Sequence, residues 1–476
     1  MRLAQKNVQE LSEAPVGRLL VKYSWPALVS MALNALYSVV DRFYIGQGCG
    51  QDAMAALTLT FPVMMLFAAF GVWIGLGHGT LLSIKLGEGD WVASEKILGE
   101  LVAFKLLFFL VLSPLVFFFV DDVLGWCGGA KVTQEAFAGA RLYLRIVVFS
   151  HLFSHLAFGL SAAMRSEGSA VGSMTCMIVG FGANIVLDPI FIFGFKMGIA
   201  GAAVATVVAM ALSCAWAFSY YLRGRSAVKM RLGRIRFYGA YAMRTLSIGF
   251  APFLQNLLGA AIGSSLAMSF AIWAETPEAA TLQIASLGVF QGVMILVVMP
   301  IMGAQQGLAP IMGFNWGARN YARVRSALVL GFWVTTALCV SACLVQTVPP
   351  FPTLLARAFV GGDNPQLLHT AAHDLVVANC MLWTISFNVV ATTYIQSIGH
   401  PKTAILLSTL RQGVCLIPCI WLLPHFMEDH ALAIWLAMPI SDVACQLATL
   451  PPLFLHFRFL GRAGLLRRRG IGRGAA

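Results

Sequence analysis

Charged side chains are scarce in this sequence. Only 11% of its 476 residues are Asp, Glu, Lys or Arg, whereas 59% are hydrophobic, and the mean hydropathy is +0.80. A soluble protein of this size needs many more charged residues to cover its surface. The composition therefore excludes an ordinary soluble domain and predicts a polytopic membrane protein.

Several catalytic motifs are also missing. The sequence contains no GxxxxGK[ST] phosphate loop, no H-E-x-x-H zinc motif and no G-x-S-x-G nucleophile motif. No polar segment is long enough for a separate ATPase domain. We therefore do not expect an enzyme or an ATP-driven pump, and we expect no cofactor.

Cysteine usage gives no sign of a disulfide framework. Eight of the ten cysteines, from Cys176 through Cys445, lie inside apolar blocks, and only Cys49 and Cys127 are placed where they could oxidise. We expect no structural disulfide.

Long apolar blocks follow one another along the whole chain. Each is long enough to cross the roughly 30 Å hydrocarbon core of a bilayer as a helix. The blocks fall near residues 18–43, 53–82, 97–120, 137–163, 169–194, 199–222, 244–273, 283–310, 324–347, 370–396, 403–424 and 431–457. The sequence therefore predicts an all-α fold of twelve transmembrane helices.

The basic residues gather in alternate connecting segments. Lys and Arg are concentrated near the N-terminus, between the sixth and seventh blocks and at the C-terminus, whereas the other set of segments carries mostly Asp and Glu. This bias predicts that both termini are cytoplasmic in a multi-pass protein of the inner or plasma membrane. We attribute the net charge of +12 to contacts with anionic lipid headgroups and not to nucleic acid.

Weak internal repetition divides the chain into two parts. The glycine pattern of Gly75–Gly89 is repeated in Gly303–Gly317, on the two sides of a basic stretch. We therefore expect an N-terminal six-helix lobe (1–225), a basic cytoplasmic linker (226–242) and a C-terminal six-helix lobe with a basic tail (243–476). Six is an even number, so the two repeats are parallel, and such repeats form a cleft suited to alternating access.

Two acidic residues, Asp41 and Asp188, follow uncharged apolar runs of nearly equal length. Both lie about 18 to 20 residues past an inner boundary, or roughly 27 to 30 Å along a helix. A carboxylate at such a depth is costly unless it is paired, protonated or bound to an ion. This symmetry is the main sequence clue to function.

Other polar residues surround these two acids in the sequence. The first block carries a stripe of four, and the fifth and sixth blocks add three more: Asn34, Tyr37, Ser38 and Asp41, then Asn184, Asp188 and Thr206. If the stripes face one another, the two carboxyls share one pocket and titrate together as a proton site, or as a Na⁺ site if enough oxygens converge. The alternative interpretation makes Asp41 an interfacial residue beside Arg42 and Asp188 a turn former before Pro189.

The remaining ionisable residues within blocks favour structural roles. We expect His151 and His155 to be hydrogen-bonded core histidines, since no third metal ligand is near them. We expect Arg411 and Asp442 to form an ion pair, since each alone would be expensive to bury.

Two further expectations concern residues near the membrane surfaces. Lys105 is expected to extend its amine to the inner face. His369, His373 and Asp374 are expected at the outer face.

Small residues favour close packing between the fifth and sixth blocks. Gly198, Gly201, Ala202 and Ala205 open the sixth block and leave its backbone uncovered. We expect the two helices to approach closely there.

Five stretches resemble the multidrug and toxic compound extrusion (MATE) family, in particular its MepA and DinF-like branches. They are YSVVDRFYIG (37–46), TLTFPVMML (58–66), NIVLDPIFIFGFKMGIAGAAVATVV (184–208), MPIMGAQQGLAPIMGFNWGARNYARV (299–324) and TTYIQSIGHPKTAILLSTLRQG (392–413). The resemblance implies two six-helix lobes forming a V-shaped central cavity and export of organic cations in exchange for H⁺ or Na⁺.

The same resemblance assigns roles to particular residues. It places the cation site on Asp41, Asn184, Asp188 and Thr206, and it places Asn34, Tyr37 and Ser38 along the substrate cavity. Some relatives carry a further acid in the seventh span, whereas this chain has none there before Glu275. Coupling through the second lobe is therefore not expected.

Other functions are compatible with the same composition. A flippase for lipid-linked oligosaccharides shares the two-lobe plan but needs a strongly cationic cavity, whereas the pocket predicted here is acidic. An intramembrane enzyme or a channel is the rival from another class. We expect a monomeric transporter whose partners are small cationic or amphipathic drugs and membrane lipid.

Overall fold

The computed structural model describes residues 2–127, 132–360 and 364–468, with the backbone alone described for 2–6, 51, 452–457 and 459–468. Every regular element in these residues is helical. Eleven helices are long and apolar enough to cross a membrane, and a bent pair of shorter helices makes twelve if it is one span. The all-helical expectation is confirmed. The side chains of the predicted basic tail at residues 467–469 lie outside the described residues.

The chain forms two compact units. Unit 1 comprises Met1–Phe253 with Gly313–Arg319, and unit 2 comprises Leu254–Met312 with Asn320–Ala476. The helices of unit 1 are α1 (Arg2–Glu13), α2 (Val16–Gly87), α3 (Trp91–Phe118), α4 (Val120–Trp126), α5 (Gln134–Val147), α6 (Ser150–Ser166), α7 (Ala170–Pro189), a π-helical turn (Ile190–Gly194), α8 (Gly198–Leu222) and the start of α9 (Gly239–Trp273). Those that lie mainly in unit 2 are the rest of α9, α10 (Pro277–Gly317), α11 (Tyr321–Thr347), α12 (Phe351–Val360), α13 (Pro365–Asn379), α14 (Ile385–Ser397), α15 (Pro401–Thr409), a π-helical segment (Leu410–Leu416), α16 (Ile417–Leu422) and α17 (His430–Arg468).

Two breaks explain how these helices make twelve spans. The long helix α2 is interrupted at Gly50, whose φ of 79° suits a residue without a side chain, so it contains the two spans Val16–Gly50 and Asp52–Gly87. Helices α5 and α6 are bent by 49° at the short break between them and together form one broken span.

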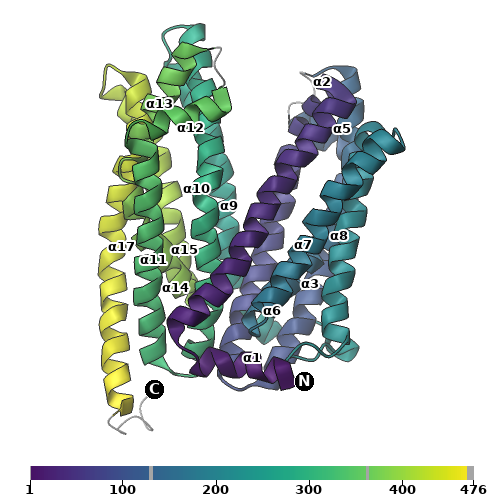
Figure 1. The fold of residues 1–476 in the computed structure, drawn as a ribbon, viewed down its shortest axis with the longest axis vertical. Coiled ribbons are helices and arrows are strands. Elements are labelled where there is room, and N and C mark those ends of the chain that lie inside the picture. The colour runs from purple at the N-terminus through teal and green to yellow at the C-terminus, as the bar shows by residue number, and fades with distance from the viewer. Residues whose placement is uncertain (1, 128–131, 361–363, 469–476) are drawn as a thin grey trace. The chain divides into compact units, whose positions relative to one another are not determined.

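Small residues bring α7 and α8 together in unit 1. A Cβ added at Gly180 of α7 would lie 3.0 Å from the Cβ of Ser213 on α8. A Cβ added at Gly201 of α8 would lie 2.8 Å from the carbonyl oxygen of Phe191 in the π-helical turn after α7, and Ala202 and Ala205 are fully buried. The two helices run side by side, next to the first half of α2 (Figure 1). The expected close approach of the fifth and sixth spans is confirmed.

A second close crossing joins the second span of α2 to the start of α9. A Cβ added at Gly77 would lie 2.1 Å from the Thr245 carbonyl oxygen, and a Cβ added at Gly249 would lie 2.0 Å from the Trp73 carbonyl oxygen. The Trp73 indole N–H donates to the Leu246 carbonyl oxygen at 2.7 Å. Because the backbones touch here, only glycine fits at both positions.

The segment between α8 and α9 is fixed to unit 1 by a buried carboxylate. Glu167, which follows α6, accepts hydrogen bonds from the Ser226 hydroxyl at 2.6 Å and from the backbone N–H groups of Ala227 and Val228 at 2.9 and 3.1 Å. Burial raises the pKa of Glu167 to about 7, and the hydrogen bonds oppose that rise. The start of the basic linker is therefore held in place.

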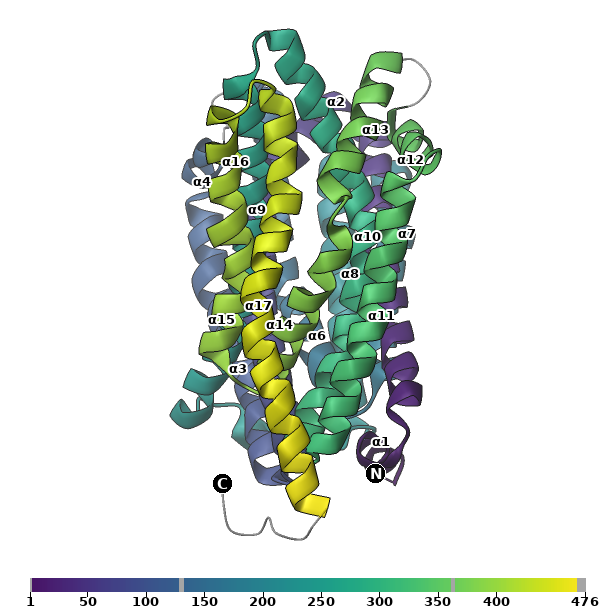
Figure 2. The ribbon, with the colours of Figure 1, turned by 90° about the vertical axis from the view of Figure 1, so that its left-hand side faces the viewer.

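Unit 2 is organised around α17. Figure 2 shows α17 running along this unit, with α13 and α14 on one side and α15 and α16 on the other. Its buried Trp435 packs against the rings of Phe270 and Phe290, at centroid distances of 5.2 and 5.3 Å. This cluster is the apolar core of the unit.

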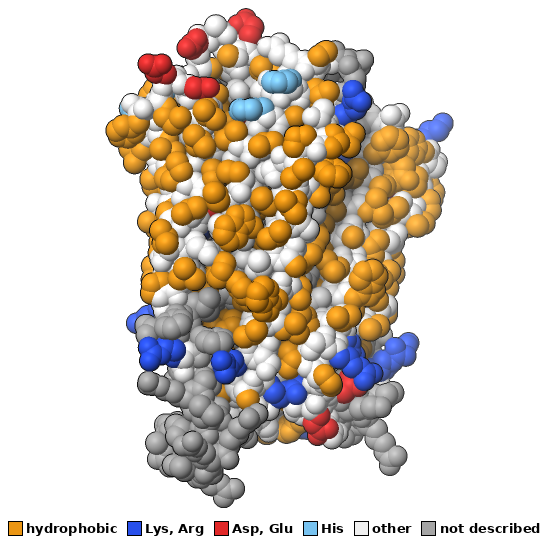
Figure 3. All heavy atoms as spheres, turned by 60° about the vertical axis from the view of Figure 1, so that its left-hand side comes forward, with side chains coloured by type: hydrophobic (Ala, Val, Ile, Leu, Met, Phe, Trp, Pro, Cys, Tyr) orange, Lys and Arg blue, Asp and Glu red, His pale blue; other side chains and the backbone are white. Residues whose placement is uncertain are grey.

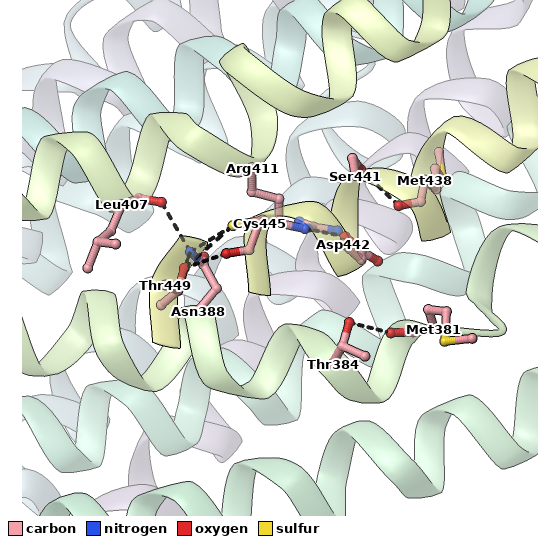
Figure 4. A network of polar contacts seen from close by, with 10 residues as sticks. All are labelled: Met381, Thr384, Asn388, Leu407, Arg411, Met438, Ser441, Asp442, Cys445 and Thr449. Carbon is pink, nitrogen blue, oxygen red and sulfur yellow. Dashed lines mark hydrogen bonds and ion pairs between the residues drawn. The ribbon is translucent and has the colours of Figure 1, made fainter. Parts of the chain in front are cut away.

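A polar network crosses the interior of unit 2 (Figure 4). The Asn388 amide of α14 donates to the Leu407 carbonyl oxygen at 3.1 Å and points toward Cys445 and Thr449 on α17. Nearby, the Arg411 Nε–H donates to Asp442 Oδ1 at 2.6 Å, which confirms the expected ion pair. Arg411 lies in the π-helical segment, a wider turn that re-aims side chains within a helix.

The surface suits a bilayer. On the face shown in Figure 3, hydrophobic side chains cover the middle, Lys and Arg gather toward one end, and Asp and Glu gather at the other. Exposed Leu, Phe and Trp side chains are frequent on the spans. A surface of this kind is stable in lipid and unstable in water.

Breaking the Arg411–Asp442 pair should destabilise the protein strongly. In Asp442→Asn the Arg411 cation, only 24% exposed, loses its counter-ion. We expect a loss of about 3 kcal/mol, the lower end of the range for an orphaned buried charge. Replacing both residues, as Arg411→Met with Asp442→Leu, should cost less, as measured by unfolding in detergent.

The exposed ion pair between Arg141 and Asp121 provides the control. Its side chains are 42% and 51% exposed, so Asp121→Asn should cost less than about 1 kcal/mol. Equal unfolding temperatures for Asp442→Asn and Asp121→Asn would show that the inner pair is not needed for stability.

Candidate cation site in unit 1

The two acidic residues singled out in the sequence lie on adjacent helices. Asp41 is in the first span of α2 and is 8% exposed, and Asp188 is in the last turn of α7 and is fully buried. Helices α2 and α7 pack together, and the Tyr37 ring stacks on Phe181 of α7 with centroids 5.4 Å apart. The two carboxyls are within direct electrostatic reach of one another.

A hydrogen-bonded pair of polar side chains adjoins the carboxyls. The Asn184 amide nitrogen, one helical turn before Asp188, donates to the Thr206 hydroxyl oxygen of α8 at 3.3 Å. The Thr206 hydroxyl in turn donates to the Ala202 carbonyl oxygen at 3.0 Å. These bonds hold the Asn184 amide nitrogen toward Thr206, so the amide oxygen Oδ1 points away from Thr206.

Four oxygens around the pair have no hydrogen-bond donor within the described residues. They are Asp41 Oδ1, Asn184 Oδ1 and both carboxyl oxygens of Asp188. Buried acceptors without a partner are costly, and charged ones are more costly still. The arrangement is therefore suited to bind a proton or another cation, which would give these oxygens the partner that the protein does not provide.

The chemistry of the donors restricts which cation fits. Carboxylate and amide oxygens are ligands for hard cations such as Na⁺, and a carboxyl pair can also share a proton. The described part of the chain contains no group of three or more His, Cys, Asp or Glu residues that could hold a metal ion. The site is thus an oxygen site and not a transition-metal site.

Of the other predicted cavity residues, Tyr37 lies within electrostatic reach of both Asp41 and Asp188. Asn34 and Tyr37 are half-buried, whereas Ser38 is exposed and donates to the backbone oxygen of Asn34 at 3.0 Å. Arg42 is exposed and lies over the ring of Phe61 at 5.7 Å. Asp41 itself is 8% exposed, and Arg42 lies within its electrostatic reach.

Two aromatic residues at the site could not be found from the sequence. Tyr143 of α5 is buried and lies within electrostatic reach of Asp41 and Asp188. Phe181 covers the ring of Tyr37. Both are ordinary apolar-block residues in the sequence, and only helix packing brings them to the carboxyls.

Three predictions about other ionisable residues were wrong. Lys105 does not extend to the membrane surface: it is fully buried, and its amine donates to the Gly71 carbonyl oxygen at 2.6 Å. Asp374 is not an interface residue but is buried and accepts a hydrogen bond from Ser286 at 2.6 Å. His151 is in the core as expected, but its Nε2 has no hydrogen-bond partner among the described residues.

Comparison with known proteins decides the family. The family model named MatE matches residues 26–190 and 260–422 of this chain, and the first range includes Asp41, Asn184 and Asp188 of the candidate cation site. The chain belongs to the MATE family. It is therefore a multi-pass membrane transporter and not an enzyme.

Individual relatives agree with this assignment. The multidrug export protein MepA of Staphylococcus aureus (strain NCTC 8325 / PS 47) is 25% identical over 463 residues, covering 95% of this chain and 97% of MepA. The structure of the MATE multidrug transporter DinF-BH, solved in complex with a small-molecule ligand, is 31% identical, with a TM-score of 0.80 over 92% of this chain and 95% of that one.

A third structure supports the fold alone. The outward-facing conformation of a MATE family transporter of the MOP superfamily has a TM-score of 0.86 at 20% identity, covering 96% of this chain and 99% of that chain.

Removing the Thr206 hydroxyl should loosen the site. In Thr206→Val the side-chain shape is kept, but the buried Asn184 amide loses its acceptor. We expect a loss of about 1 to 3 kcal/mol in unfolding free energy, typical of an orphaned buried donor. Thr206→Ser retains the oxygen and should unfold near the wild-type temperature; equal stability of the Val and Ser variants would contradict the hydrogen bond.

Proposed function

We propose that this MATE transporter exports organic cations and other toxic compounds in exchange for H⁺ or Na⁺, and that Asp41 and Asp188 bind the coupling ion. Asn184 and Thr206 complete the site, and Asn34, Tyr37 and Ser38 line the path of the exported compound. The names of its relatives, a multidrug export protein and a ligand-bound multidrug transporter, support this class of substrate.

One observation carries the proposal. Two carboxyls on α2 and α7 are buried together, and four oxygens of the site have no donor within the described chain. A purely structural acidic pair would be paired with a cation of the protein, as Asp442 is with Arg411. An acidic pair without such a cation is suited to bind a transported ion reversibly.

Charge bias supports a location in the cell membrane with both termini in the cytoplasm. The basic segments lie at the start of the chain, between α8 and α9, and at the C-terminus. Positively charged connections remain on the cytoplasmic side of a membrane protein. In this topology the ends of α2 at Gly87 and of α6 at Ser166 face the cytoplasm.

Neutralisation of the pair provides a physical basis for alternating access. When the ion binds from outside, the repulsion between the carboxyls disappears, and α2 can change its packing against α7. Pro26 lies within α2, where it removes one backbone hydrogen bond and leaves a point at which the helix can bend. Release of the ion to the cytoplasm restores the charged site for the next cycle.

The number of ions exchanged determines what drives export. If one proton enters for each monovalent drug cation that leaves, no net charge moves, and only the pH gradient contributes. If two protons enter, one net charge crosses, and a potential of 100 mV contributes about 2.3 kcal/mol. That free energy corresponds to about a 50-fold concentration ratio of the drug.

Removing either carboxyl should abolish coupled efflux. We expect Asp41→Asn and Asp188→Asn each to lose ethidium efflux from proteoliposomes under imposed pH or sodium gradients, because neither variant can hold and release the ion. The wild-type protein should respond to only one of the two gradients, and that gradient identifies the coupling ion.

Asp122→Asn is the matched control, since this carboxylate is exposed at the start of α4. It should transport like the wild type. All variants should insert into the membrane to the same extent. Undiminished efflux by both Asp41→Asn and Asp188→Asn would rule out this coupling site.

A further inference from the structure

A second group of ionisable side chains is buried in unit 1, apart from the Asp41–Asp188 pair. It comprises His78 of α2, Glu100 and Lys105 of α3, and His151 and His155 of α6, all at most 7% exposed. The proposed coupling site uses none of them. Burying so many titratable groups is costly, and such groups in a membrane protein mark functional positions.

The geometry fixes which nitrogen of His78 carries the proton. Its Nδ1 lies 2.8 Å from the Ile74 carbonyl oxygen. A carbonyl oxygen only accepts, so Nδ1 must be the protonated nitrogen. In the neutral ring Nε2 is then an acceptor, and it has no hydrogen-bond partner among the described residues.

The atom that faces this lone pair is another acceptor. Glu100 Oε2 lies 3.7 Å from His78 Nε2 and also lacks a hydrogen-bond partner in the described chain. The other oxygen, Oε1, accepts the backbone N–H of Tyr238 at 2.6 Å. Two buried acceptors that face one another repel, and one added proton would convert them into a donor and an acceptor.

Only a small movement is needed to complete that bond. The distance of 3.7 Å is about half an ångström beyond the upper limit of a normal N···O hydrogen bond, which is roughly 3.2 Å. A proton on Glu100 Oε2 can be donated to the His78 Nε2 lone pair, and it then satisfies both orphaned atoms at once. The pair is therefore a one-proton site.

Neighbouring charges do not supply the missing donor. Lys105, the cation within electrostatic reach of His78, donates instead to the Gly71 carbonyl oxygen at 2.6 Å. His155 of α6 lies against the backbone of Gly71. On the linker side, Arg234 forms an ion pair with Glu95 at 2.9 Å.

The position of the pair favours exchange with the cytoplasm. Glu100 is nine residues from the start of α3 at Trp91, or about 14 Å along the helix. Asp188 is 18 residues from the start of α7 at Ala170, or about 27 Å. His78 and Glu100 thus lie between the linker end of the unit and the coupling site.

We propose that His78 and Glu100 form a second proton-binding site, which exchanges one proton with the cytoplasm and controls how firmly the linker 226–242 is held on α3. A carboxylate accepts a hydrogen bond more strongly than a carboxylic acid does. Loss of the proton therefore strengthens the bond to the Tyr238 N–H, and uptake weakens it. The linker is the direct connection between α8 and α9, so cytoplasmic pH would influence transport through it.

Infrared difference spectroscopy of the full-length protein tests the site directly. We would first replace both coupling carboxyls, as Asp41→Asn with Asp188→Asn, to remove their signals. A pH step should then still show a C=O band from Glu100, beside a separate band from Glu167, whose pKa burial raises to about 7. Adding Glu100→Gln should abolish the Glu100 band and leave that of Glu167, and adding His78→Gln should shift the Glu100 band.

The variant Glu100→Gln is expected to fold, because an amide can accept from Tyr238 and donate to His78 Nε2, as the protonated carboxyl would. Glu95→Gln is the matched control on the same helix, since Glu95 also holds the linker but through Arg231 and Arg234. It should leave the Glu100 band unchanged. Absence of a band beside that of Glu167 in the double Asn background, or persistence of both bands in Glu100→Gln, would overturn the proposal.

A transport measurement tests the effect on the linker, and this part rests on the proposed function. In inverted membrane vesicles the bath sets the cytoplasmic pH. With the pH gradient across the membrane held constant, so that the driving force does not change, ethidium transport by Glu100→Gln should lose its response to cytoplasmic pH, whereas Glu95→Gln should keep it. An unchanged pH profile in Glu100→Gln would contradict control through the linker, while normal transport by the Asp41 and Asp188 variants would contradict the coupling site alone.

Discussion

The cost of placing ionisable groups inside a bilayer governs this structure. Water cannot solvate them there, so each must find a partner within the protein or take one from outside. Arg411 and Asp442 satisfy each other across unit 2. Asp41 and Asp188 do not, because both need a positive partner and no ion pair within the described chain provides one. We propose that this contrast separates a structural ion pair from a site that binds a transported ion.

Helix packing creates the conditions for that site. Gly201 and its alanine neighbours allow α8 to lie close to α7, which brings the Thr206 hydroxyl within reach of Asn184. The glycines at the α2–α9 crossing allow a similar approach at Gly77 and Gly249. Close contacts of this kind leave little room for water, so the charge on a buried carboxyl retains its full effect on its surroundings.

Much of the fold and part of the site were predictable from the sequence. Apolar runs predict the spans, and the equal spacing of Asp41 and Asp188 predicts a similar depth. The Arg411–Asp442 pair followed from the cost of burying either residue alone. The spans and the ion pair are confirmed, because helix length and the cost of burying a charge follow from residue counts and residue types, which a sequence gives directly.

The remaining contacts depend on the rotation of each helix about its axis, which sets the direction of its side chains. Lys105 was expected at the surface because a lysine near a helix end can extend to water, but packing turns its amine toward the Gly71 carbonyl. Asp374 is close to an end in the sequence yet points into the core toward Ser286. Helix rotation and contacts between distant segments also bring Tyr143 to the carboxyls and place His78 Nε2 opposite Glu100 Oε2. A single sequence does not supply these.

We propose that the Asp41–Asp188 pair holds the coupling ion in one stage of the transport cycle and is empty in the stage that binds the exported cation, so that the two cations exclude one another. Ethidium binding to the purified protein, measured in weakly buffered solution over a series of proton and sodium concentrations, tests this most directly. The account predicts that ethidium affinity falls as the coupling ion rises and that binding displaces this ion into solution. Ethidium affinity that is the same at every proton and sodium concentration, with no ion displaced, would contradict it.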